Sequence, residues 1–210
     1  MAKRTWLPLA ALALLGVLAA YALRTFRTPG EDVGASPSVV QILDDRRSPQ
    51  VVRGEGNLTV VMFTDYQCPS CRLADPALRA AIARDGNIRL IYRDWPIFGE
   101  RSERAAKVAL AAHRQGIYPA LHQRLMTSAS LDEAALRAAV EHAGGNWERV
   151  EADLLAHGTE ISDQLADNGS DAFALGLEGT PGYLIGPLLV EGALTEREFL
   201  RAFGQARSRG

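Results

Sequence analysis

The feature that most constrains this chain is a pair of cysteines, Cys68 and Cys71, placed shortly after an apolar run. The run Val60–Phe63 has the length and composition of a buried strand, and Pro69 suits the first turn of a helix, where its missing N–H costs nothing. Residues three apart lie on one face of a helix, so the two sulfur atoms can approach closely enough for a disulfide. The free N–H groups and the positive dipole end of this helix favour a thiolate at Cys68, the form that attacks disulfides.

Three kinds of chemistry are open to such a pair. Because these are the only two cysteines in 210 residues, and no second CxxC or HxxxH pair exists, a four-ligand structural zinc site is the least favoured. A purely structural disulfide would close a very short loop and would remove little entropy from the unfolded chain. Redox chemistry is therefore favoured over a structural bridge, and both are favoured over metal binding.

The N-terminal segment predicts export. Lys3 and Arg4 precede the uncharged run Trp6–Leu23, whose length is at the lower limit for crossing a bilayer. The sequence Ala20–Ala22 resembles a signal-peptidase site, but the run is longer than a usual signal core and basic residues follow it. An uncleaved anchor over residues 1–27 is slightly favoured over a cleaved signal, and either suits a protein that uses a disulfide.

A single folded domain is expected after this segment. Residues 28–38 are rich in Pro, Gly and Ser and are typical of a linker, so the domain is placed at 39–210. Val39–Leu43 is expected to be a small helix or an arm packed on it. The formal net charge of −2 argues against a nucleic-acid surface.

The first half of the domain predicts a strand–helix–strand unit. Leu58–Thr64 is the first expected strand, and Asn87–Asp94, in which Ile88, Leu90 and Tyr92 alternate with other residues, is the second. A helix connects them, which implies a parallel pair with a right-handed crossover.

The pattern is then helical from residue 101 to about 177, with no strand candidate. Asn146 is expected to cap a long helix, and Asn168 with Gly169 to end it before one more short helix.

Strands return near the C-terminus. Gly182–Ile185 and Leu188–Glu191 predict an antiparallel hairpin, and Thr195 is expected to cap a last helix. Thr180 and Pro181 come just before the hairpin. Proline at a strand start is usually punctuation, and only about 5–6% of X–Pro bonds in folded proteins are cis, so the residues alone do not predict a cis bond here.

Three segments together resemble the DsbA-like thiol:disulfide oxidoreductases. They are FTDYQCPSC at the first strand, YRDWPIF after the second, and GTPGYLIG before the hairpin. The resemblance runs from about Leu58 to the C-terminus. It implies an α/β thioredoxin-like fold over about 50–99 and 178–207, with an inserted α-helical domain at about 100–177.

The resemblance also implies roles for individual residues. Cys68 matches the exposed attacking cysteine that becomes linked to substrate, and Cys71 matches the buried resolving partner. Thr180 and Pro181 match a cis-proline loop that lies beside the disulfide and pairs with an extended substrate segment. Pro69–Ser70 is the supporting dipeptide between the cysteines.

This sequence departs from the family pattern at two positions. Many relatives have an acidic residue six positions before the first cysteine, where this chain has Met62, so the source of a buried proton is in question. Ser70 replaces the histidine of the strongest oxidants, and it offers only a neutral hydrogen bond. Asp65 is a nearby carboxylate of unknown direction that is equally typical of a turn.

We therefore expect a thiol:disulfide oxidoreductase of the bacterial cell envelope, in the oxidase direction, with a reductase or isomerase as the alternative. The redox-active disulfide Cys68–Cys71 requires no organic cofactor or metal. The expected partners are cysteine-containing envelope proteins as substrates and a membrane redox protein that reoxidises or reduces the chain. The expected location is the inner membrane facing the periplasm, or the periplasm if the N-terminal segment is cleaved.

Two non-enzymatic alternatives remain open. A binding module could hold Cu(I) at the two thiolates. Its other ligands would be drawn from the four histidines, although their spacing forms no recognisable ligand set: His113, His122, His142 and His157. A chaperone that holds peptides on the helical block would instead function without either cysteine.

Overall fold

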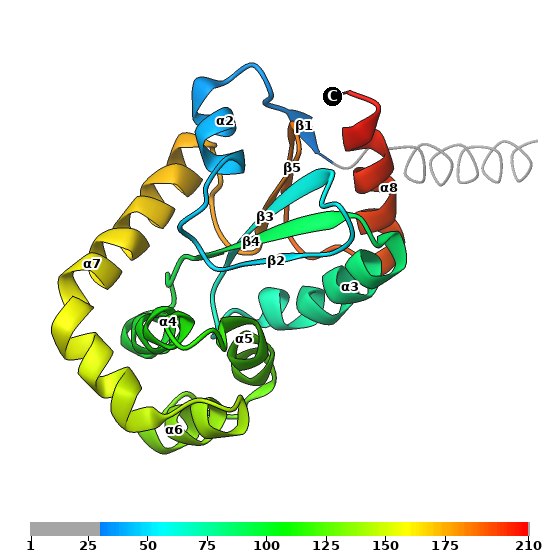
Figure 1. Cartoon of the computed structure of the whole chain (residues 1–210). Coiled ribbons are helices and arrows are strands. Elements are labelled where there is room, and N and C mark those ends of the chain that lie inside the picture. The colour runs from blue at the N-terminus through cyan, green and yellow to red at the C-terminus, as the bar shows by residue number, and fades with distance from the viewer. Residues whose placement is uncertain (1–29, 210) are drawn as a thin grey trace, which may run out of the picture.

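The computed structural model describes residues 30–209, which form a mixed sheet flanked by helices (Figure 1). The sheet has six strands in the order β1-β6-β5-β3-β4-β2. Their bounds are β1 Glu31–Asp32, β2 Gln50–Val52, β3 Leu58–Thr64, β4 Ile88–Asp94, β5 Gly182–Ile185 and β6 Leu188–Glu191.

The centre of the sheet has the predicted topology. β3 and β4 are parallel and are joined by helix α3 (Pro69–Asp85), and β5 and β6 form the expected antiparallel hairpin beside β3. Gly86 ends α3 in the left-handed conformation that glycine adopts without strain. β2, which pairs antiparallel with β4, was not predicted, because its three residues give too short a pattern.

Alternate residues of β3 contribute to two different core layers. Val60 and Met62 pack in the larger layer, with α3 and α8 (Glu196–Arg207), while Val61 and Phe63 pack in the smaller layer with α2 (Pro37–Leu43). Figure 1 shows α3 and α8 on one side of the sheet, and α2 with the C-terminal part of α7 on the other. The period-two alternation of a strand thus fixes which residues can face α3 and its cysteines.

The helical insertion lies where the sequence placed it. It consists of α4 (Glu100–His113), α5 (Tyr118–Thr127), α6 (Glu133–His142) and α7 (Trp147–Ala174). The expectation that Asn168 and Gly169 end the long helix is wrong, because α7 continues through both. The Asn168 side chain is buried and bonds Arg93 and the Asp94 carbonyl, so it acts as a core residue. The deviation within α7 lies instead at His157, whose backbone is non-helical.

The N-terminal boundary also needs correction. Part of the expected linker 28–38 has regular structure, because Glu31–Asp32 pairs with β6 and α2 begins at Pro37. The small helix expected over Val39–Leu43 is confirmed. The expected anchor at residues 1–27 lies outside the described part of the chain, and within residues 30–209 no helix is long and apolar enough to cross a membrane.

Candidate active site

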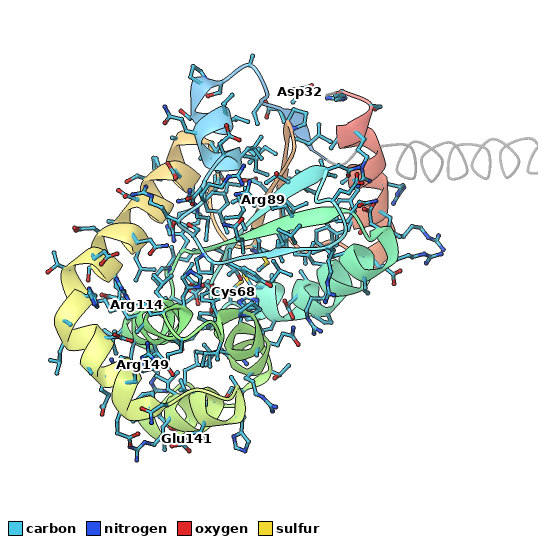
Figure 2. The ribbon with its side chains drawn as sticks, in the orientation of Figure 1. Asp32, Cys68, Arg89, Arg114, Glu141 and Arg149 are labelled. Atoms are coloured by element: carbon cyan, nitrogen blue, oxygen red, sulfur yellow. The ribbon has the colours of Figure 1, made fainter. Side chains whose placement is uncertain are left out.

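Cys68 lies where β3 leads into α3, between the sheet and the helices of the insertion (Figure 2). Cys71 follows in the first turn of α3. Both are free thiols. Cys68 is the N-cap of α3, and its Sγ accepts a hydrogen bond from the Cys71 N–H at 3.2 Å. Pro69 occupies the first helical turn, as predicted, and Pro69 and Ser70 are exposed. The local sequence therefore directs a backbone donor and the helix N-terminus at one sulfur atom.

The loop before β5 covers the Cys68 sulfur atom. The Thr180–Pro181 peptide bond is cis, which confirms the geometry that the resemblance implied. The Cys68 Sγ donates to the Thr180 carbonyl oxygen at 3.2 Å. Cys68 is consequently only 2% exposed, so the expectation of an exposed attacking cysteine is wrong for this dithiol state. The loop is anchored in turn, because the Pro181 carbonyl accepts from the Gly192 N–H at 2.8 Å.

Asp65 holds a second loop against the active-site turn. Its buried carboxylate accepts hydrogen bonds from the N–H groups of Gln67, Ile97 and Phe98 and from the Ser102 hydroxyl, at 2.6–3.0 Å. The turn-forming reading of Asp65 is therefore correct but incomplete. By fixing the loop backbone, it holds the Phe98 carbonyl within reach of Gln67, the residue that precedes Cys68, while the side chains of Ile97 and Phe98 stay half-exposed.

A buried polar cluster that the sequence did not reveal lies between β4, the active-site turn, α5 and α3. The Tyr118 hydroxyl donates to Asp94 Oδ2 at 2.8 Å, and the Tyr66 hydroxyl lies 3.2 Å from the Tyr118 hydroxyl. Tyr66 also contacts His122 Nδ1 at 3.3 Å, and His122 Nε2 contacts Asp75 Oδ1 at 3.3 Å. His122 is a core histidine with partners on both ring nitrogens.

Burial controls the protonation of several groups around the cysteines. It raises the pKa of the Cys71 thiol to about 12, against a smaller lowering influence of the Thr180 and Thr64 hydroxyls. It also raises the pKa of Asp94 to about 6, although His122, Tyr118 and Tyr66 oppose this rise. At neutral pH, Cys71 is therefore a thiol that must lose its proton before it can attack a disulfide.

The ionisation of Asp94 should make stability fall as pH rises. The raised pKa means that the folded protein binds this proton more tightly than the unfolded chain does. The resulting stability is present below about pH 4, the usual range of aspartate, and is lost as pH rises to about 6. Raising the pKa of Asp94 from about 4 to about 6 corresponds to about 3 kcal/mol in the free energy of unfolding. Urea unfolding across this range should show that Asp94→Asn lacks this dependence; parallel curves for the two proteins would contradict it.

The copper alternative gains no supporting geometry. Within the part of the chain that the structure describes, no group of three or more His, Cys, Asp or Glu side chains is arranged to hold a metal ion. His122 already contacts Tyr66 and Asp75, and the other three histidines lie on α4, α6 and α7.

Comparison with known families agrees with this site. The family model described as the DSBA-like thioredoxin domain matches residues 59–204, which is most of the chain and includes both cysteines and the cis-proline loop. The chain belongs to this family. The fold class expected from the resemblance, a thioredoxin-like fold with a helical insertion, is thereby confirmed, and so is membership of the DsbA-like thiol-disulfide oxidoreductases.

Solved structures give the same result for this DsbA-like chain. A thioredoxin-like oxidoreductase from Silicibacter pomeroyi is 34% identical, with a TM-score of 0.76 over 83% of this chain and 99% of the other. A periplasmic thioredoxin-like protein from Salmonella enterica is 26% identical, with a TM-score of 0.71 over 82% and 98%. The thiol-disulfide exchange protein alpha-DsbA2 from Wolbachia pipientis shares the fold at 24% identity, with a TM-score of 0.74 over 80% and 93%.

Some relatives of this DsbA-like chain are much longer proteins, of which it matches a part. The Na⁺/H⁺ antiporter NhaA 3 of Salinispora tropica is 28% identical over 197 residues, which are 84% of this chain but 28% of the antiporter. NhaA 1 of Mycolicibacterium gilvum is 25% identical over 210 residues, 93% of this chain and 34% of the antiporter. The chain thus spans about a third or less of the length of these two relatives.

Proposed function

We propose that this protein is a thiol:disulfide oxidoreductase of the cell envelope that oxidises the thiols of substrate proteins. The observation that carries the proposal is the setting of Cys68. Its sulfur caps a helix N-terminus, accepts from the Cys71 N–H, and touches the carbonyl of the cis-proline loop. The helix N-terminus and the Cys71 N–H favour negative charge on this sulfur atom, and the cis-proline loop beside it would pair with an extended substrate segment.

The chemistry needs only the two cysteines and two substrate thiols. A substrate thiolate attacks Cys68 Sγ of the disulfide, the bond between the two enzyme sulfurs breaks, and Cys71 leaves with the electron pair and takes a proton. A second substrate thiolate then attacks the substrate sulfur of the mixed disulfide and releases Cys68 as a thiolate. Two electrons pass to the enzyme, the substrate gains a disulfide, and a redox partner must reoxidise the dithiol.

The proposed roles of the remaining site residues follow from their positions. Thr180 and Pro181 would receive an extended substrate segment, and Pro69 and Ser70 form the exposed surface over the buried sulfurs. Because the Thr180 carbonyl accepts from Cys68 in the dithiol, a disulfide substrate must displace this contact to reach the Cys68 sulfur atom.

The proposed location is the periplasmic side of the inner membrane, or the periplasm if residues 1–27 are removed. The support is the apolar N-terminal sequence, together with the periplasmic relative in Salmonella enterica. The proposed substrates are cysteine-containing envelope proteins, and the proposed partner is a membrane redox protein.

The reduction potential of the Cys68–Cys71 pair decides the direction of electron flow. Equilibrating the full chain against glutathione should give a value nearer the roughly −120 mV of DsbA than the roughly −270 mV of thioredoxin. A value near that of thioredoxin would assign a reductase, which Ser70 in place of histidine would help to explain. The absence of any two-electron couple would overturn the redox assignment.

A further inference from the structure

Among the buried polar atoms of residues 30–209 that lack hydrogen-bond partners, two lie at the ends of β3 and β4. They are Thr64 Oγ1 and Asp94 Oδ1. The parallel register of β3 and β4 places Thr64 directly beside Asp94, and the strand alternation puts both on the sheet face that packs against Cys71. The Thr64 hydroxyl lowers the pKa of the Cys71 thiol, against the larger raising effect of burial. Thr64 is thus the sheet neighbour of Asp94 on the face that carries the layer of the buried thiol.

From Asp94 the polar contacts continue without interruption to the protein surface. The order is Asp94, Tyr118, Tyr66, His122 and Asp75, with each contact between 2.8 and 3.3 Å. Asp75 then accepts from Arg79 Nε at 2.8 Å, and the Arg79 side chain is 37% exposed. The inner end of this chain thus lies beside Thr64, and its outer end reaches solvent.

This series of contacts from Asp94 to Asp75 has two complete hydrogen-bond patterns, and both contain the same number of protons. In the first, Asp94 is ionised, each tyrosine hydroxyl donates toward it, and a charged His122 donates to Tyr66 and to Asp75. In the second, Asp94 is protonated and donates to Tyr118, each hydroxyl donates toward a neutral His122, and His122 still donates to Asp75. Moving one proton across each hydrogen bond between His122 and Asp94 Oδ2 converts the first pattern into the second, and every hydrogen bond between these two groups is kept in both.

We propose that Asp94, Tyr118, Tyr66 and His122 form a proton relay that carries a proton between solvent and Cys71, with Thr64 as the last link. The relay would perform the task that an acidic residue at the position of Met62 performs by family resemblance. The inference rests on the proposed function, because it describes proton movement in the same disulfide exchange.

The relay supplies the proton that Cys71 needs in one direction of the reaction and removes it in the other. When Cys71 leaves as a thiolate, it takes the proton of the Thr64 hydroxyl, and Thr64 takes one from protonated Asp94. His122 takes up a proton from solvent past Asp75 and Arg79, and the charged imidazole then passes one inward through the hydroxyls of Tyr66 and Tyr118 to Asp94. When the Cys71 thiol attacks a mixed disulfide, the same transfers run outward: Cys71 loses its proton, the enzyme disulfide forms, and the substrate thiolate leaves.

The variant Tyr66→Phe tests the relay at its centre. It removes one hydroxyl, while Tyr118 still donates to Asp94 and His122 still contacts Asp75. Tyr92→Phe is the matched control, because the Tyr92 ring packs on Tyr118 and His122 but its hydroxyl is not part of the chain of contacts. Reduced full-length protein is mixed with a disulfide-bonded peptide, and samples quenched with acid are analysed by mass spectrometry for the mixed disulfide at Cys68.

The expected result is that the mixed disulfide accumulates in Tyr66→Phe, with its resolution by Cys71 slowed about tenfold or more, since positioned acid–base groups contribute ~10²–10⁴-fold. The control should resolve it at the wild-type rate. Equal rates for Tyr66→Phe and Tyr92→Phe would overturn the relay. A wild-type protein that forms no mixed disulfide would instead overturn the proposed function.

A second measurement uses only the wild-type protein and so does not depend on the folding of a variant. The rate of the Cys71 step is followed in mixtures of H₂O and D₂O. A relay in which several protons move together predicts a curved dependence of this rate on the deuterium fraction. A linear dependence, or no isotope effect, would contradict the relay.

Discussion

Replacing Cys68 with serine should abolish disulfide exchange. A serine hydroxyl is not ionised near neutral pH and cannot form a disulfide, so the electron-accepting bond is lost together with the attacking atom. The measurement is the oxidation of a dithiol peptide by the oxidised full chain, with repeated turnover supplied by a disulfide such as oxidised glutathione. Turnover retained by Cys68→Ser would remove the basis of the assignment.

Cys71→Ser is the matched control, because it makes the same isosteric change only three residues away. Its expected phenotype is different: Cys68 still attacks a disulfide substrate, but no thiol remains to resolve the mixed disulfide. The substrate should therefore stay linked to Cys68 and be visible as a covalent complex that reducing agent releases. If both variants were inactive without any complex, Cys68 would not be the attacking residue.

The elements that the sequence predicted correctly are those coded by local patterns. The run Leu58–Thr64, the CxxC pair with Pro69, and the hairpin after Pro181 each carry their signal within a few residues. The helix capped by Thr195 has the expected reciprocal hydrogen bonds with Glu198. The cis bond at Pro181 is different, because it could be expected only from the family resemblance.

The elements that the sequence missed depend on partners far away in the chain. Asn168 looks like a helix stop in isolation, but its side-chain oxygen bonds Arg93, 75 residues earlier. Tyr66, Tyr118 and His122 likewise meet only because α5 packs beside the active-site turn. The covering of Cys68 depends on Thr180, which is 112 residues distant. No local pattern contains such contacts, and only the folded arrangement shows them.

The largest expected loss of stability comes from Arg93→Met. Arg93 is 7% exposed, and its guanidinium contacts Asp45 at 2.8 Å, Asp171 at 3.1 Å and the Asn168 oxygen at 2.8 Å. It thereby ties β4 to the segment after α2 and to α7. Removing it leaves the buried Asp45 carboxylate without its charged partner, which costs about 3–5 kcal/mol. Urea unfolding at neutral pH measures this loss.

The control is Arg84→Met, since Arg84 pairs with Glu196 on the surface and such pairs contribute ~0–1 kcal/mol to the free energy of unfolding.

Acid conditions distinguish a lost ion pair from lost packing as the cause of the destabilisation in Arg93→Met. Burial opposes the ionisation of Asp45, but hydrogen bonds from Ser48 and Arg47 and the charge of Arg93 outweigh it and hold the Asp45 pKa below its usual value. The stability that a lowered Asp45 pKa contributes is fully present above about pH 4, the usual range of aspartate. It is lost as pH falls through the pKa that Asp45 has in the folded protein. The deficit of Arg93→Met should therefore shrink below about pH 4, where Asp45 takes up a proton. A deficit that stays constant across this range would show that the loss comes from packing alone.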